Sequence, residues 1–244
     1  MSFLGGFPLL SGLFACGALT YAGAAPFHVV VDVSGVANAQ PYVEPVKKLF
    51  EEWYPKVNDL LFGTGSSLPF EEVRVIFERK TQVDTGKGPQ QAPAYSKANV
   101  IHANFQAETR FDNSYQAMLI HELVHVCQNY TGLARSPARW VGEGVADYVR
   151  HKYFEKDLLP KLEWDSDGTL KDSPLERATL EKQGYLIGYT IAAPFLYWLE
   201  LQKNPRIVAI LSQAVRNSHY SAGLFQEHCG DSLDTLWRAF LEQK

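Results

Sequence analysis

Two histidines and a glutamate form a pattern that can bind and use a metal ion. The segment His121-Glu122-Leu123-Val124-His125 has the form H-E-x-x-H. Four residues advance an α-helix by about 400°, so the two imidazoles project from one face, one turn apart. Imidazoles at this spacing can bind one tetrahedral ion, with Glu122 beside the position of a metal-bound water. The pattern predicts Zn²⁺ held by His121 and His125, with Glu122 as general base, against the alternative of two hydrogen-bonded core histidines.

A second acidic segment can supply the third ligand that such a site needs. Glu143 follows the second histidine after 17 residues (126–142), and Asp147 comes four residues later. On a helix these two carboxylates face the same way. Glu143 then completes a His₂Glu donor set, and Asp147 accepts a hydrogen bond from a ligand imidazole. The competing interpretation is a solvated acidic face. It is less favoured because the helix is largely apolar and because Gly142 and Gly144 permit close approach of a neighbouring backbone.

The elements predicted around these residues begin with a small mixed sheet. Residues 27–33, 72–77 and 99–103 are rich in β-branched and apolar residues, which predicts three strands. Residues 41–61 carry apolar residues at helical spacing, and we expect a helix there. Residues 80–97 are rich in Gly, Gln and Pro without periodicity, which predicts a loop.

The remaining elements are predicted to be helical. Residues 115–130, which contain the H-E-x-x-H motif, are apolar almost all round, as is typical of a helix buried in a core. The C-terminal half is predicted to be mainly helical, at about residues 140–153, 184–202, 205–216 and 231–242. The fold class expected is therefore α+β, with a small mixed sheet, an active-site helix and a helical C-terminal half.

Composition favours one domain and excludes some partners. The chain has 244 residues, of which 46% are hydrophobic, enough for one substantial core over residues 25–244. Charged residues make up 20%, and the formal net charge is −4. This balance gives no electrostatic footprint for nucleic acid or an anionic membrane, so we expect neither as a partner. We expect a monomer.

The N-terminus predicts export. Residues 1–24 carry no charge, are rich in Leu, Phe, Gly and Ala, and end in an A-x-A-like site, Ala22-Gly23-Ala24. This indicates a secretory signal peptide and a secreted protein, although the usual positive n-region is missing. A transmembrane anchor and an ordinary buried N-terminus are the alternatives. After cleavage Cys127 and Cys229 would remain, either as a disulfide or as two free thiols.

Several segments together resemble the basic secretory proteins, a family of plant and bacterial gluzincin-like zinc metallopeptidases. The matching segments are Val31-Asp32-Val33-Ser34, Ile101-His102, residues 121–128, residues 143–150, Gly188-Tyr189 and Gly230-Asp231-Ser232. The sequence departs from the family at Cys127, where an aromatic residue is usual, at Pro194, within a segment that is normally helical, and in its acidic charge.

The resemblance implies a zincin-like fold and a zinc-dependent hydrolase that cleaves peptide bonds of polypeptide substrates as an endopeptidase. It also implies that the strand at residues 99–103 borders the active-site helix. An extended peptide could add to that strand through main-chain hydrogen bonds.

Tyr189, in the family's Gly-Tyr pair, is predicted to be a second catalytic residue. Hydrolysis through a tetrahedral intermediate needs a preorganised donor for the oxyanion. Pro194 cannot donate a hydrogen bond to the carbonyl of Thr190, so a helix here either kinks or begins close to Tyr189. Either arrangement could aim the phenol at the substrate. The alternative is an ordinary core aromatic residue. The other candidate donors are less favoured: Tyr148, Tyr185, His219 and His228.

Two other functions compete with this interpretation. The first is a secreted defence or binding protein that keeps a zinc site without physiological peptidase activity. A structural zinc is normally closed by four protein ligands, whereas three are found here, which favours an open catalytic position. The second is a zinc aminopeptidase, but no signature of an anchor for a free amine is found in the sequence.

Overall fold

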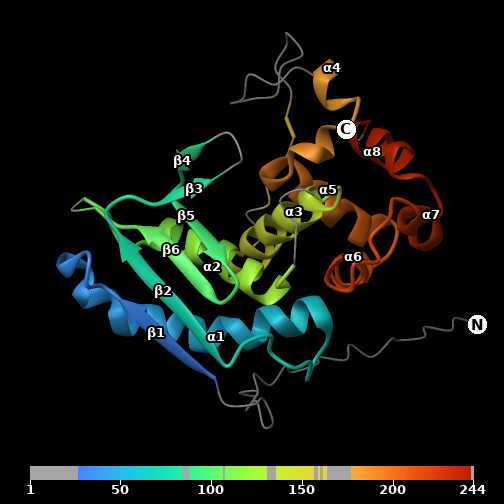
Figure 1. Cartoon of the computed structure of the whole chain (residues 1–244). Helices are drawn as coiled ribbons and strands as arrows, with labels where there is room; N and C mark the ends of the chain where they lie inside the picture. Colours follow the sequence, from blue (N-terminus) through green and yellow to red (C-terminus); the bar gives the residue numbers. More distant parts are fainter. Residues whose placement is uncertain are drawn as a thin grey trace, which may run out of the picture.

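A small sheet lies on one side of the molecule and the C-terminal helices lie on the other, with α2 (Asn113–Gln128) and α3 (Arg139–Val149) between them (Figure 1). The expected α+β class is therefore confirmed. The computed structural model describes residues 27–84, 88–106, 108–130, 136–156, 159, 162–163 and 177–242. The predicted signal peptide lies outside the described residues.

The sheet is mixed, as the sequence predicts. Its four strands lie in the order β1 (His28–Asp32), β2 (Glu72–Glu78), β6 (Val100–Asn104) and β5 (Ala94–Lys97). Strands β1, β2 and β6 are parallel, and β5 is antiparallel to β6. Along β2, fully buried residues alternate with half-buried ones, so one face of the sheet packs into the core. Helix α1 (Val43–Phe62) contacts β1, and α2 contacts β5 and β6.

The loop predicted at residues 80–97 is wrong. This segment contains β3 (Gln82–Asp84), β4 (Pro89–Gln91) and β5. These strands are three or four residues long and largely polar, so they show no alternation that a sequence pattern could reveal. Strand β5 reads Ala-Tyr-Ser-Lys and forms because its backbone pairs with the hydrophobic strand β6. Tertiary pairing here overrides weak local propensity.

The same topology corrects the expected place for an extended peptide. Strand β6 lies inside the sheet, paired with β2 on one side and with β5 on the other, so it has no free edge. Within the described part of the chain, the sheet ends at β5, beside α2. An added strand would therefore pair with β5 rather than with residues 99–103.

Helix α2 begins at a conventional cap and runs through the core. The side chain of Asp112 accepts a hydrogen bond from the Tyr115 amide at 3.0 Å, which caps the first turn. The helix ends at Asn129, whose φ of 45° places it in the left-handed region. Most residues from Leu119 to Gln128 are buried, in agreement with the predicted core helix.

Helix α3 packs closely against α5 (Tyr189–Gln202) because Gly144 has no side chain. A Cβ added at Gly144 would lie 2.7 Å from the Cβ of Ala192, which is too close for two carbon atoms. The glycine next to the predicted ligand therefore permits the close approach of a neighbouring backbone that the sequence predicts. Beyond Val149 the helix widens into a short π-helical segment, η3 (Arg150–Phe154).

The C-terminal half is helical, with one break that the sequence pattern does not predict. Its remaining elements are α4 (Arg177–Leu180), η4 (Gly184–Ile187), α6 (Ile207–Arg216), α7 (Gly223–Cys229) and α8 (Leu233–Leu241). The helix predicted over 184–202 is interrupted at Gly188, so α5 begins at Tyr189, one of the two arrangements that Pro194 allows. Helix α7 was not predicted.

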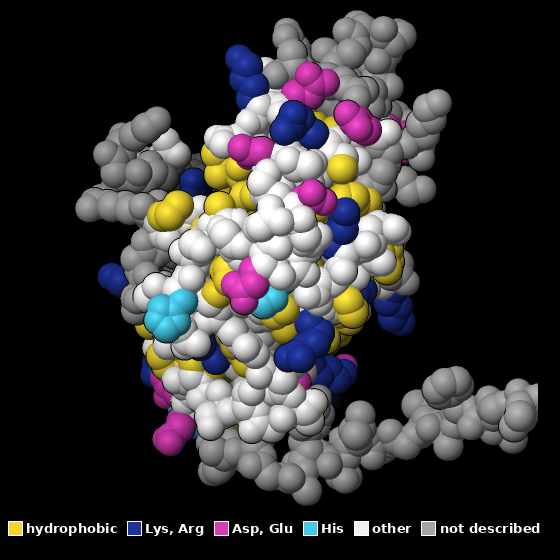
Figure 2. Space-filling view, turned by 90° about the vertical axis from the view of Figure 1, so that its right-hand side faces the viewer, with side chains coloured by type: hydrophobic (Ala, Val, Ile, Leu, Met, Phe, Trp, Pro, Cys, Tyr) yellow, Lys and Arg dark blue, Asp and Glu magenta, His cyan; other side chains and the backbone are white. Residues whose placement is uncertain are grey.

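Buried residues from both halves form one hydrophobic core. Within the described ranges, helices are too short or too polar to cross a bilayer. On the face shown in Figure 2, acidic and basic side chains are interspersed with apolar ones. Cys127 is buried with its thiol 3.7 Å from the carbonyl of Tyr54, and both Cys127 and Cys229 are free thiols.

Candidate metal centre

Helices α2 and α3 bring the three predicted ligands to one point. The Nε2 atoms of His121 and His125 lie 3.2 Å apart. The Oε2 atom of Glu143 lies 3.6 Å from the first of these nitrogens and 3.3 Å from the second. Within the described residues, these three side chains form the one cluster of His, Cys, Asp and Glu that could hold a metal ion.

The spacing of these atoms fits a tetrahedral zinc ion. Zinc–nitrogen and zinc–oxygen bonds of about 2.0–2.2 Å place neighbouring ligands of a tetrahedron about 3.3–3.5 Å apart. The three observed separations, 3.2, 3.3 and 3.6 Å, fall on or beside this range. The donor types also fit, because two imidazoles and one carboxylate are a common zinc donor set. With three protein ligands, a fourth position stays open for water or substrate.

Asp147 forms a hydrogen bond with His121. Its Oδ1 atom accepts a hydrogen bond from Nδ1 of His121 at 2.7 Å, and both groups are buried. Because Nδ1 carries the proton, the lone pair on Nε2 faces the proposed metal position. Burial raises the pKa of Asp147, but the hydrogen bond to His121 outweighs burial, and the net shift is downward. The carboxylate therefore stays ionised.

Gln128 orients His125, a role that sequence reasoning missed. Its Nε2 donates to the carbonyl of Gly142 at 3.0 Å, and this carbonyl can only accept. The amide is thereby oriented, and its Oε1 accepts from Nδ1 of His125 at 2.7 Å. One side chain thus links a predicted ligand to the residue before Glu143. The signal in the sequence was the position of Gln128, three residues after His125 on one helix face.

The electrostatics of the cluster favour a cation. Burial opposes charge on all three side chains, but their mutual hydrogen bonds outweigh it. The pKa of Glu143 is held below its usual range by His121 and His125. Burial would lower the pKa of His121, yet Asp147 and Glu143 raise it to about 10. Without a metal, protons on the imidazoles neutralise the buried carboxylates, and a dication would take the place of those protons.

Glu122 is next to the predicted ligand His121 in the sequence, and its carboxylate has no hydrogen-bond partner among the described residues. It is only 7% exposed. It follows His121 on α2, and its charge raises the pKa of both His121 and His125. A buried, unpartnered carboxylate next to an open coordination position can accept a proton from water.

Tyr189 also lies at the cluster. Its ring is parallel to that of His121, at 9° with centroids 6.0 Å apart. Burial and then the charge of Glu143 raise the pKa of its phenol to about 12, so the hydroxyl keeps its proton at neutral pH. Its φ of 48° is unusual for a residue with a large side chain. The residue directly before it, Gly188, also has a positive φ, of 75°. Such backbone strain is often found at functional sites.

The other candidate donors have different surroundings. The hydroxyl of Tyr148 donates to Glu200, and that of Tyr185 donates to Asp234. His228 lies 3.5 Å from the exposed carboxylate of Glu227. His219 is exposed after the end of α6. Tyr189 is the predicted donor whose ring contacts a residue of the cluster, His121.

Comparison with known proteins identifies the family of the chain. A search of curated proteins finds no match. The family model BSP, described as peptidase of plants and bacteria, matches residues 40–240. This range contains all the residues of the cluster and most of the fold. The chain therefore belongs to this family of plant and bacterial peptidases.

Proposed function

We propose that this peptidase is a zinc metallopeptidase with a zincin-like fold, in which His121, His125 and Glu143 hold the ion. One observation carries the proposal: three donors of the right types lie at the edge lengths of a zinc tetrahedron. The hydrogen bonds that His121 and His125 donate through Nδ1 to Asp147 and Gln128 support it, because they turn both Nε2 atoms toward the same point.

The residues around the ion would divide the chemistry of peptide hydrolysis. Bound zinc supplies a Lewis acid that polarises the scissile carbonyl and acidifies water. Glu122 accepts the proton of the attacking water and later delivers it to the leaving amine. The phenol of Tyr189 donates a hydrogen bond to the oxygen that becomes negative in the tetrahedral intermediate.

The substrate we propose is an extended polypeptide. Strand β5 ends the described sheet, so its outer backbone groups are available to pair with an added strand. Helix α2, which carries the ligand histidines, contacts β5. A substrate bound as a strand along this edge can extend beyond both ends of β5. This favours cleavage inside a chain over stepwise removal of terminal residues. We therefore propose an endopeptidase, acting as a monomer.

The catalytic proposal can be tested with wild-type protein and the Glu122→Gln variant, purified with zinc. We expect about one zinc per chain in both proteins, measured by mass spectrometry of the metal. We expect wild type to cut casein into internal fragments and the variant to lose this activity by about 10²-fold or more, because an amide cannot accept the proton.

Two results would contradict the proposal in different ways. A Glu122→Gln variant that cuts casein at the wild-type rate would remove the residue from catalysis. Wild-type protein that holds zinc but cleaves no polypeptide would favour a defence or binding protein in which the metal is not catalytic.

We also propose that the protein is secreted as one domain, residues 25–244. Support comes from the uncharged, apolar residues 1–24 that end in Ala22-Gly23-Ala24, and from the single hydrophobic core. Expression of the full chain in a secreting host should release a protein whose N-terminal residue is Ala25. Retention of intact residues 1–24 in the cell would contradict export.

A further inference from the structure

Large apolar side chains are exposed mainly at one place. Among the described residues, the large hydrophobic side chains that are clearly exposed are Leu186 at 52%, Ile187 at 42%, Tyr189 at 40% and Leu201 at 60%. Three of these four lie within four consecutive positions, at the end of η4 and the start of α5. Single exposed hydrophobic residues are common on protein surfaces, but a contiguous group usually marks a binding surface.

This group lies directly beside the proposed metal ligands. A Cβ added at Gly188 would lie 3.1 Å from the Cβ of Glu143 and 3.7 Å from the Cα of Trp140. Consecutive Cα atoms are about 3.8 Å apart, so the Cα atoms of Ile187 and Tyr189 each lie one residue from the Cα of Gly188, which makes this contact. The ring of Tyr189 is parallel to that of His121. The exposed residues Leu186 and Ile187 therefore immediately precede the glycine that packs against Glu143.

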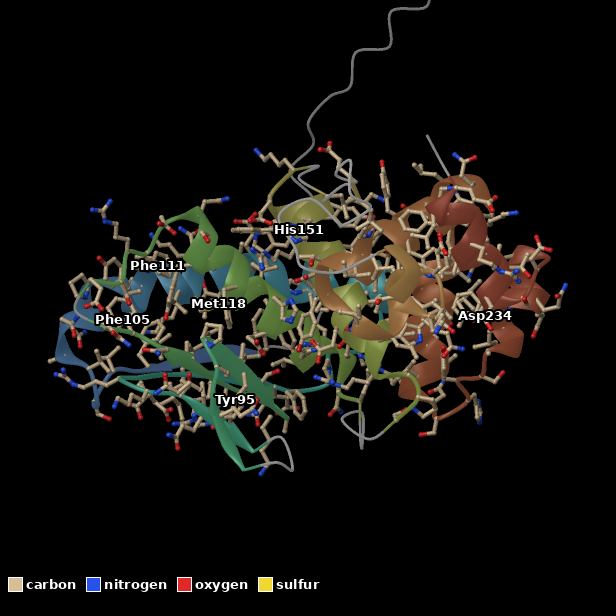
Figure 3. All side chains as sticks on the ribbon, turned by 90° about the horizontal axis from the view of Figure 1, so that it is seen from above. Tyr95, Phe105, Phe111, Met118, His151 and Asp234 are labelled. Carbon is tan, nitrogen blue, oxygen red and sulfur yellow. The ribbon has the colours of Figure 1, made fainter. Side chains whose placement is uncertain are left out.

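The segment Gly184–Ile187 is held firmly from the side of the core. The hydroxyl of Tyr185 donates to Asp234 at 2.9 Å, and its ring packs against Trp140 and Trp237. Figure 3 shows Asp234 among the C-terminal helices. The amide of Gly188 donates to the Tyr185 carbonyl at 3.0 Å, which closes the turn. Leu186 and Ile187 are therefore exposed on a preorganised turn, and a ligand that binds them need not order it.

From this arrangement we infer that Leu186 and Ile187 form an apolar subsite that binds a bulky aliphatic or aromatic side chain of the polypeptide, next to the scissile bond. The inference rests on the proposed function and adds the substrate class. The substrate is the occupant because the surface adjoins Glu143 and Tyr189. A second copy of the chain seated here would stand in front of the metal ligands.

Leu201 provides a matched control on the same helix. It is at least as exposed as the other three, but it lies twelve residues after Tyr189, about 18 Å along the α5 axis. Leu201→Gln removes the same kind of side chain from the surface without touching the turn. The Leu186→Gln, Ile187→Gln double variant removes two exposed aliphatic side chains from the turn that precedes Gly188.

The test is digestion of a defined peptide library by the zinc-loaded proteins, with cleavage sites identified by mass spectrometry. Wild type and Leu201→Gln should cut with enrichment of Leu, Ile, Met or Phe at one position next to the cleaved bond. The double variant should lose this enrichment. For one peptide with an apolar residue there, its kcat/KM should fall about tenfold or more, with little change for a polar analogue. Zinc content and Tm should match wild type.

Several outcomes would overturn the inference. Wild-type cleavage without apolar preference would do so while leaving zinc catalysis intact. The same holds if the double variant keeps the wild-type preference, or if Leu201→Gln loses it equally. A wild-type dimer that the double variant dissociates, measured by light scattering, would assign the surface to a second copy. If zinc-loaded wild type cuts no peptide in the library, the proposed function itself fails.

Discussion

The two regions that meet at the candidate metal centre are built in opposite ways. Helices α2 and α3 are regular and buried, and they carry the three proposed ligands together with Glu122, Asp147 and Gln128. The segment Gly184–Tyr189 is a short 3-10 turn that runs into two consecutive residues with positive φ, and it exposes Leu186, Ile187 and Tyr189. Groups that must meet at fixed distances lie on packed helices. Groups that must meet a substrate lie on a turn that the core holds in place.

The largest expected effect comes from breaking the buried side of this comparison. Glu143→Ala removes one of three ligands, so zinc content should fall from about one per chain to near zero and peptidase activity should be lost. Metal analysis after gel filtration measures the first, and casein cleavage the second. Glu52→Ala, an exposed glutamate paired with Lys56 on α1, is the control and should leave both unchanged. Unchanged zinc affinity in Glu143→Ala would remove this residue from the ligand set.

The next effect tests the exposed side. Tyr189→Phe keeps the ring that is parallel to His121 but removes the hydroxyl, so kcat should fall about 10²-fold or more. Zinc content and Tm should stay close to wild type, because little packing is lost. Tyr197→Phe, on the same helix, should leave kcat unchanged. Wild-type turnover in Tyr189→Phe would return this residue to a packing role.

A smaller effect is expected from the residues that orient the two histidines. Asp147→Asn replaces a charged partner of His121, and Gln128→Met removes the partner of His125. Each should weaken zinc binding about 10- to 100-fold, as is usual for hydrogen bonds to metal ligands. Competition with a chelator of known affinity measures this without reference to activity.

Gln128→Glu sharpens the same prediction. The carboxylate can still accept from His125, but it faces the Gly142 carbonyl without a donor. If the link between α2 and α3 matters, Gln128→Glu should weaken zinc binding despite its negative charge. Zinc binding tighter than wild type would show that only the contact with His125 counts.

The smallest effect concerns the packing that holds both regions together. Alanine at Gly144 would place its Cβ 2.7 Å from Ala192 and 3.2 Å from a methyl of Leu196. Overpacking of this kind costs about 1–3 kcal/mol, which outweighs the roughly 1 kcal/mol that alanine gains over glycine in a helix. Urea unfolding should therefore show a less stable Gly144→Ala variant. Gly223→Ala, where the nearest atom is at 3.4 Å, should be close to neutral.

The sequence predicts the buried side of the site better than the exposed side. The spacing of His121 and His125, and of Glu143 and Asp147, is set by the period of a helix, so geometry follows directly from residue number. The separation between the two helices does not follow in this way. It depends on the Gln128–Gly142 hydrogen bond and on the contact of Gly144 with Ala192, which are tertiary.

The exposed side shows why the remaining predictions failed. The apolar run at 184–202 has the composition of one continuous helix, yet Gly188 lies in the left-handed region and packs against Glu143. Away from this side, the sequence predicts a loop where β5 lies, because pairing with β6, and not its own four residues, makes it a strand. In both places a distant part of the chain determines the local conformation.

Strand β5 has a consequence for the solubility of the protein. An edge that can pair with one extended substrate can also pair with the same edge of another copy, and that is how sheet proteins aggregate. Here the edge is four residues long and ends at the exposed Lys97. Two copies paired at β5 would gain few hydrogen bonds, and each would carry a lysine charge into the shared edge. The edge can therefore remain available to a substrate strand while disfavouring growth into larger assemblies.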